Sequence, residues 1–503
     1  MTGWSPLMPV ADLERQLPHA PPFTDMVAGT APRIGLFWTA GNPAGLVHNA
    51  SEARAELGIG FGNEVGKYRR PQDPDDVALR RLSGIAWRRV GRGAAAGRIV
   101  AESRDIGSAP YAALVAPYVS DPLVVTDTTL PAMRRLVARL EGAIAWEERW
   151  LSVGLSAGAE VWDNRTSEAR FPRLGRASRP AVAAAVGARL PFLQIRLAGQ
   201  VRWMGGNETV LLAAQPDAGT VYLLDGYSEP DPRRVVPPRV LFRRIDRDAL
   251  ALGGGLEGRF LGVQWVVFGQ HERRTNEHSS VRDEAPPRDR WRARGWTYGA
   301  AAQGVGLRGS LLVTAWARHT GLTGDATRAD LNDAVFFRSD EDVTQGSLEL
   351  RYVPRASPWR VTAAFVFIRE QRVRRDFIAD VRSEFSSWAP GGRMEIARRF
   401  RSTTLNVGAA ASGYTPVALI PDASAMGPVY QTLVAQELAL YALRATSVAG
   451  TVGAAYRRGR TTLALAVIAE RLSERGNEAT TLAFAPTGSR TRWRLTLRVI
   501  FDG

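Results

Sequence analysis

The segment RWRLTLRVIF at residues 492–501 divides by parity into two chemically different sets. Even positions hold Arg492, Arg494 and Arg498, and odd positions hold Trp493, Leu495, Leu497, Val499 and Phe501. Because successive side chains of a β-strand point to opposite faces, the segment predicts a strand with one apolar and one largely cationic face. The fold depends on which medium each face meets.

The same alternation recurs along the chain. It is seen in ARAELGIGFG (53–62), RLVARLEGAIAW (135–146), WLSVGLSAGAEVW (150–162), LQIRLAGQVRW (193–203) and LALGGGLEGRF (250–260). This recurrence predicts one large antiparallel sheet. A soluble β-sandwich is the alternative, but its outer faces carry mixed polar residues, whereas the polar face here consists of Arg, Glu, Gln and Gly.

Strand length and connection length favour a membrane barrel. Transmembrane strands need about 9 to 11 residues within the hydrocarbon, and the alternating segments are at least that long. Connections alternate between short (91–95, 147–149, 190–192, 261–262, 303–304, 355–358, 457–460) and long (105–131, 211–247, 276–289, 321–341, 474–489, with 417–445 read as a further external loop). We therefore expect an all-β, transmembrane antiparallel β-barrel of about 18 strands, with 14 or 16 as alternatives, because outer-membrane barrels have even strand numbers.

This fold assigns the two faces of each strand. The apolar face would meet lipid, and the polar face would line the lumen, where opposite charges on neighbouring strands can pair. The expected lumen-facing charges are Arg54, Glu56, Arg135, Arg139, Glu141, Glu160, Arg196, Arg202, Glu257, Arg259, Arg494 and Arg498. Tryptophans near strand ends predict an interfacial aromatic girdle made of Trp146, Trp150, Trp162, Trp203, Trp265, Trp359 and Trp493.

Composition restricts the compartment and the chemistry. The chain has a net charge of +15 and no cysteine, which excludes disulfides and thiolate metal sites. The arginines are spread over many strands and interleaved with Glu and Gly, so no nucleic-acid surface is expected. The longest apolar runs are too short for a spanning helix. No signal peptide is visible in residues 1–16, so location in a bacterial outer membrane requires a leader outside this sequence.

Catalytic and metal-binding patterns are weak. Gly154–Gly158 matches GxSxG, but the segment continues as a strand where a nucleophile elbow needs a helix. The glycines at 253–255 lack the Gly-Lys-Ser/Thr of a phosphate loop and instead predict small lumen-facing residues that let a plug or neighbouring side chains approach. His271 and His278 are expected in a solvated loop, without tight ligand spacing. We expect no enzyme activity, cofactor or metal, although a barrel hydrolase using lumen-rim groups is a third alternative.

Residues 1–50 do not alternate and are rich in proline, which predicts an irregular N-terminal arm or a hatch that plugs the barrel of residues 51–503. Within this segment, Asn42, Pro43, Ala44, Gly45 and Leu46 resemble the NPAGL motif of the long-chain fatty-acid transporter family. The wider order, through Tyr68–Gln72 to the closing strand, is similar to an uncharacterised family of bacterial outer-membrane β-barrel proteins. That resemblance implies outer-membrane lipid as surroundings and a TonB-dependent receptor, or another envelope uptake component, as partner.

Two functions follow from this interpretation. The first is transport of a small or amphipathic solute across the outer membrane beside a plug, with rings of arginine favouring anions, or assistance to an uptake system. The second is a non-conducting structural, secretion or assembly barrel. Conductance measurements separate the two.

Overall fold

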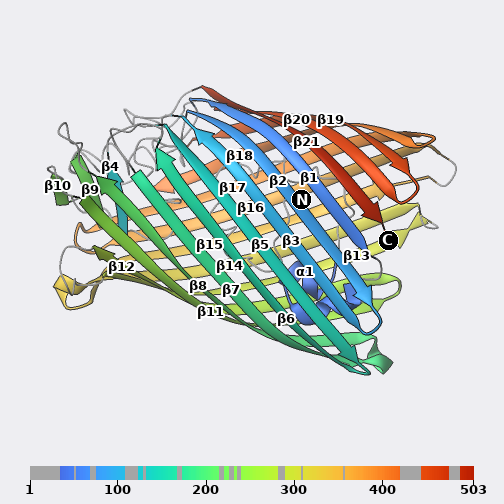
Figure 1. The fold of residues 1–503 in the computed structure, drawn as a ribbon, viewed down its shortest axis with the longest axis horizontal. Helices are drawn as coiled ribbons and strands as arrows, with labels where there is room; N and C mark the ends of the chain where they lie inside the picture. Colours follow the sequence, from blue (N-terminus) through green and yellow to red (C-terminus); the bar gives the residue numbers. More distant parts are fainter. Residues whose placement is uncertain are drawn as a thin grey trace.

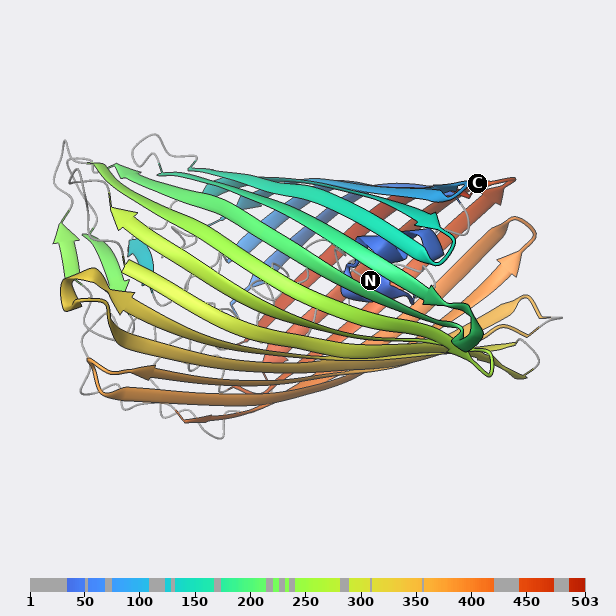
Figure 2. The same ribbon diagram turned by 90° about the horizontal axis from the view of Figure 1, so that it is seen from below.

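The computed structural model describes fourteen ranges of the chain: residues 34–49, 53–67, 75–107, 123–127, 132–166, 173–213, 220–225, 231–234, 240–280, 289–307, 310–354, 357–419, 443–474 and 488–502. Eighteen strands form one closed antiparallel barrel, which confirms the predicted fold class and strand number (Figures 1 and 2). The first barrel strand, β1, pairs with β2 on one side and with the last, β21, on the other.

The barrel strands follow one another around the wall in chain order. They are β1 Arg54–Gly66, β2 Asp76–Val90, β3 Gly93–Ile106, β5 Met133–Glu148, β6 Leu151–Thr166, β7 Arg173–Leu190, β8 Ile195–Ala213, β11 Val240–Phe260, β12 Val263–Ser280, β13 Asp289–Gly306, β14 Leu311–Arg328, β15 Ala334–Tyr352, β16 Trp359–Asp376, β17 Val381–Phe400, β18 Thr403–Leu419, β19 Ala445–Arg458, β20 Thr461–Glu474 and β21 Ser489–Asp502. β4 Leu123–Asp127, β9 Thr220–Asp225 and β10 Asp231–Arg234 form a separate small sheet at one end of the barrel (Figure 1).

At the opposite end every connection between barrel strands is short, from the two residues 91–92 to the six residues 353–358. Leu261 and Gly262, between β11 and β12, both have positive φ angles, which is the geometry of a type I′ hairpin turn. We call this end the periplasmic end and the other the outer end. The short helical segments η4 Pro191–Leu193 and η6 Ala329–Leu331 lie in connections, and α1 Leu36–Ala40, η3 Pro43–Gly45 and α2 Leu46–Asn49 lie inside the barrel near the periplasmic end (Figure 2).

The two-residue period separates the faces as expected. On β6, Val153 and Leu155 are exposed on the outer face, while Ser152, Ser156 and Glu160 are buried on the inner face. A belt of exposed apolar side chains of this kind surrounds the closed barrel, and it needs hydrocarbon to cover it. The protein is therefore an outer-membrane β-barrel. Among the helices of the described residues, none has the length and apolar character required to cross a bilayer.

The aromatic girdle is partly different from the one expected. Trp146, Trp150, Trp203, Trp359 and Trp493 are 43–60% exposed, and Trp265 packs across the outer face of Gly258. Trp162 was wrongly assigned to the girdle: it is 3% exposed and shares the inward parity of Glu160 and Asn164. Trp162 lies near a strand end, but it belongs to the polar face of β6, and its side chain therefore points into the barrel.

Several connections also differ from expectation. Residues 303–304 lie within β13, which ends at Gly306, and β14 begins at Leu311. Most of 321–341 is strand, because β14 runs to Arg328 and β15 begins at Ala334, leaving 329–333 as the connection. Both strands extend past the apolar belt, where the two faces are wet and the hydrophobic alternation that marks a strand is lost. The expected external loop at 417–445 lies mostly outside the described residues.

Candidate functional site: the plugged lumen

The segment Ile34–Asn49, which we call the plug, packs apolar side chains against the barrel wall. Leu36, Phe37, Leu46 and Val47 are each 2% exposed or less. Phe37, Leu46 and Val47 form one cluster with wall residues that include Trp87, Ala94, Ala143 and Ala145. The wall residues are mostly alanine, so the barrel provides a shallow apolar seat within an otherwise polar lumen.

Four polar wall side chains bind the plug backbone. The Glu257 carboxylate accepts a hydrogen bond from the Leu36 amide at 3.0 Å, and its other oxygen pairs with Arg196 at 2.8 Å. Arg202 donates to the Gly41 carbonyl at 3.0 Å. Gln200 and Gln264 donate to the carbonyls of Ala40 and Ile34 at 3.2 and 2.9 Å. Hydrogen bonds to charged groups contribute about 1.5–3 kcal/mol each, so Glu257 and Arg202 are the strongest of these contacts.

The NPAGL residues form the turn at the centre of the plug. The Asn42 side chain accepts a hydrogen bond from the Ala44 amide at 3.0 Å and caps η3, in which proline occupies the first position. A Cβ on Gly45 would lie 2.8 Å from the Phe37 nitrogen. The glycine is therefore required for the close approach of η3 to α1.

Two wall glycines receive the plug. A Cβ on Gly154 of β6 would lie 2.3 Å from the carbonyl carbon of Pro43, and one on Gly255 of β11 would lie 2.4 Å from Leu36 Cδ2. Gly154 belongs to the GxSxG match and Gly255 to the glycine run at 253–255. Close packing against the plug accounts for one glycine of each motif, whereas a Cβ on Gly158 or Gly253 would meet atoms of the neighbouring strands.

The plug carries one titratable side chain near the periplasmic end. His48 Nδ1 lies 3.7 Å from a carboxylate oxygen of Glu147, whose other oxygen pairs with Arg89 at 3.2 Å. Burial, followed by the positive charges of Arg196, Arg89 and Arg189, lowers the pKa of His48 from 6.5 to about 3. Because Glu147 is already paired with Arg89, it offsets little of this effect, and the docked histidine is neutral.

The expected lumen charges all have inward parity, and several meet on neighbouring strands. Arg139 donates from Nε to Glu160 at 2.8 Å, Arg498 to Glu56 at 3.2 Å, and Arg135 to the Asn164 side chain at 2.8 Å. Arg54 lies near Glu56 and Asp502. Glu141 is 2% exposed, and Arg259 is exposed close to the periplasmic turn.

A different inner surface is made where β21, β1 and β2 meet. Gly58, Gly60 and Gly62 of β1 face the lumen, and the side chains of Arg498, Arg81 and Arg494 flank them in turn. We call these six residues the arginine wall. Arg81 and Arg494 are partly exposed and Arg498 has 14% of its side chain exposed, whereas Arg202 on the side that holds the plug is 1% exposed. The plug packs mainly against β3, β5, β6, β7, β11 and β12, so the arginine wall lies away from most of the plug contacts.

Sequence reasoning missed Gln200, Gln264 and Glu147 as plug contacts. Their inward parity was visible, but nothing in the local pattern shows which inward residues face a segment 99 to 230 positions earlier in the chain. The expected solvated loop for His271 and His278 was wrong, since both lie in β12. The two side chains point to opposite faces: His271 stacks beside exposed Trp296, while His278 is buried. The described residues contain no cluster of three or more His, Cys, Asp or Glu side chains suited to a metal.

Comparisons with known proteins give likenesses of architecture. No family model and no curated protein matches the chain. Solved structures with some likeness include the ferric preacinetobactin receptor BauA of Acinetobacter baumannii (10% identity, TM-score 0.40, 90% of this chain and 80% of that one). Others are CdiB of the same organism (6%, 0.39, 90% and 60%) and the outer-membrane ferripyoverdine receptor of Pseudomonas aeruginosa (12%, 0.38, 90% and 72%). Values this low leave the function to be argued from the residues of this chain.

Proposed function

We propose that the protein lets small anionic solutes cross the outer membrane beside the plug, along the arginine wall. The observation that carries the proposal is the asymmetry of the lumen: the plug is hydrogen-bonded to one side, while partly exposed arginines, of which Arg498 pairs with Glu56, flank a row of glycines where β21, β1 and β2 meet. A row of fixed positive charges in a narrow aqueous space favours anions over cations.

The glycines of the arginine wall contribute to the proposed solute route as well as its charges. At Gly58, Gly60 and Gly62 the inner surface of β1 has no side chains. The flanking arginine side chains can therefore extend across it, and a solute can approach the backbone. This chemistry suits a solute carrying a carboxylate or phosphate, because the arginine guanidinium pairs with both in a bidentate manner.

The test is solute entry into liposomes containing the refolded full-length protein, measured by swelling with glutamate and with lysine as matched anionic and cationic amino acids. The wild-type protein is expected to admit glutamate faster than lysine. Gly60→Trp, which fills the inner surface of β1, should slow glutamate entry. Ile59→Trp is the matched control, since Ile59 is the adjacent residue on the lipid-facing side.

Charge reversal tests selectivity separately from blockage. Arg494→Glu should reduce the preference for glutamate, while Arg244→Glu, on the outer face and 50% exposed, should not. Equal entry rates for Gly60→Trp and Ile59→Trp would refute the route along the arginine wall. If neither the wild type nor a variant with a displaced plug admits any solute, the non-conducting structural barrel is the correct function.

A further inference from the structure

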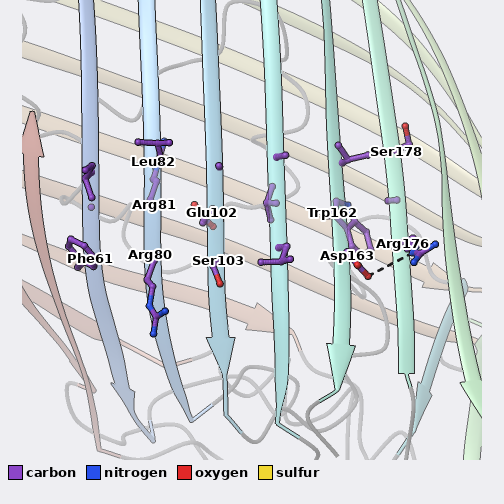
Figure 3. A pocket seen from close by; sticks show the side chains of 18 of the residues that line it. Phe61, Arg80, Arg81, Leu82, Glu102, Ser103, Trp162, Asp163, Arg176 and Ser178 are labelled. Carbon is purple, nitrogen blue, oxygen red and sulfur yellow. Dashed lines mark ion pairs between the residues drawn. The ribbon is translucent and has the colours of Figure 1, made fainter. Parts of the chain in front are cut away.

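The outer wall carries a groove that the transport proposal does not use. It crosses β1, β2, β3, β5, β6 and β7 and has a volume of about 860 Å³ (Figure 3). Its lining combines residues of two kinds on the lipid-facing parity. Ile59, Phe61, Leu82, Leu136 and Val161 are apolar and 44–49% exposed, and Arg80, Asp163 and Arg176 are charged.

Small side chains make the floor of this groove. Leu82 on β2 is in register with Ala101 on β3, which is in register with Ala138 on β5, and Ala138 is in register with Val161 on β6. Two alanines side by side, with leucine and valine on their flanks, create a hollow in the apolar wall. The hollow opens toward the bilayer, so its natural contents are hydrocarbon chains.

The rim at the outer end is cationic. Arg80, Arg134, Arg165 and Arg176 are 61–69% exposed. They share two acidic partners: Asp105 lies 3.8 Å from Arg80 and 2.6 Å from Arg134, and Asp163 lies 2.8 Å from Arg165 and 3.9 Å from Arg176. Four guanidinium groups against two carboxylates leave two positive charges in excess.

The polar and apolar parts lie in the order that an anionic lipid requires. Figure 3 shows Arg80, Asp163 and Arg176 displaced from Leu82 and Ser178 toward the outer end, where the strands run into the connections. An acyl chain in the hollow would therefore place its head group beside the arginines. Arginine side chains at such a boundary keep their aliphatic stems on the apolar wall and extend their charged groups to the interface.

We propose that this groove binds a phosphate-bearing lipid of the outer leaflet, with its acyl chains over Ala101 and Ala138 and its phosphate between Arg80 and Arg176. Guanidinium groups suit phosphate because they can form paired, charge-assisted hydrogen bonds. Ser103 and Ser178, which also line the groove, add hydroxyl groups near the head group. The bound lipid would join six consecutive strands on one side of the barrel.

The experiment uses the full-length protein refolded in detergent and native mass spectrometry to count retained lipids. Dioleoyl phosphatidic acid and dioleoyl phosphatidylcholine serve as probes with identical chains. Phosphatidic acid should be retained about tenfold more than phosphatidylcholine, the ratio expected when one further charge-assisted contact is made. The paired substitution Arg80→Gln with Arg176→Gln should abolish that preference, and Ala138→Trp should reduce retention of both lipids.

Arg338→Gln is the matched control, because Arg338 is an exposed outer-face arginine paired with Asp325 on the β14–β15 side of the barrel. It should leave the preference unchanged, and all variants should show the heat-dependent gel mobility of a folded barrel. Three outcomes would overturn the proposal: an unchanged preference in the paired variant, an equal loss in Arg338→Gln, or displacement of phosphatidic acid by an equal concentration of inorganic phosphate.

Discussion

At the scale of single residues, Gly154 shows how one position of the barrel wall can determine whether the plug fits against it. The Pro43–Ala44 peptide lies against the bare backbone of β6, and that approach leaves no space for a methyl group. The atoms that a methyl group would meet belong to the backbone of the plug, so they cannot move away by a change of rotamer as a flexible side chain could. Any enlargement of residue 154 must move the plug.

Gly154→Ala is therefore expected to displace the plug and raise solute entry into liposomes without unfolding the barrel. Gly269→Ala is the control, because a Cβ there would have no heavy atom within 4 Å. Solute swelling gives the readout, and retarded or accelerated gel migration before boiling verifies the barrel. Unchanged entry in Gly154→Ala would mean that the plug tolerates the methyl group and does not limit passage.

His48 makes plug docking dependent on pH. Above pH 6.5 the histidine is neutral whether the plug is docked or displaced. Below 6.5 the displaced plug takes up a proton, whereas the docked histidine remains neutral down to about pH 3, so docking weakens as the pH falls. At pH 5 the loss is about 2 kcal/mol, from 1.36 kcal/mol for each pH unit below 6.5.

Protease cleavage within the plug measures this effect. Cleavage should be faster at pH 5 than at pH 7.5 for the wild type, after correction for the protease's own pH profile on an unfolded substrate. His48→Gln should remove the difference, since it leaves no titratable group at that position. A pH dependence that persists in this variant would assign the effect to another group.

At the scale of strands, periodicity predicted most of the fold and failed where its physical cause is absent. Alternation arises because one face meets lipid and the other meets water, so it identified β6 and β21 directly. Beyond the apolar belt both faces are wet, and the ends of β14 and β15 were consequently predicted as loop. Trp162 lies near a strand end but on the inward parity of β6, so parity predicts its direction and position along the strand does not.

The candidate site was less predictable than the fold. Inward parity identified Glu257 and Arg202, but their contacts with Leu36 and Gly41 span separations of 221 and 161 residues. No local pattern encodes which of many inward side chains meets the plug. The glycine run at 253–255 indicated that a plug or neighbouring side chains would approach the wall, and the structure shows both, since a Cβ on Gly255 would meet Leu36 and one on Gly253 would meet Gln200.

Depth along a strand should determine the cost of a charge on the lipid face. Leu155 of β6 lies within the apolar belt, and Leu151 begins the same strand at the periplasmic end. Leu155→Arg should lower the free energy of unfolding in lipid vesicles by about 2–4 kcal/mol, and Leu151→Arg by about 0–1 kcal/mol. Equal costs at the two positions, measured by denaturant titration, would contradict the assigned position of the bilayer.

At the scale of the whole molecule, the pairing of β1 with β21 closes the barrel. Ile59 and Leu497 are in register across this junction, and Leu465 lies one strand beyond Leu497. Because the natural chain has no cysteine, cysteines introduced at Ile59 and Leu497 should form the sole disulfide on oxidation. The pair at Ile59 and Leu465 should not, since two strand spacings of about 4.8 Å exceed disulfide reach.

The plug inside the barrel has a consequence for the order of assembly. Residues 34–49 precede every barrel strand in the chain, whereas the wall they pack against is closed by a strand near the other end. A completed cylinder offers its interior only through its two rims, and the outer one is far from the seat of the plug. The plug therefore takes its place most directly while β1 and β21 are still apart, so the last step of folding would enclose a part of the chain that was synthesised before any barrel strand.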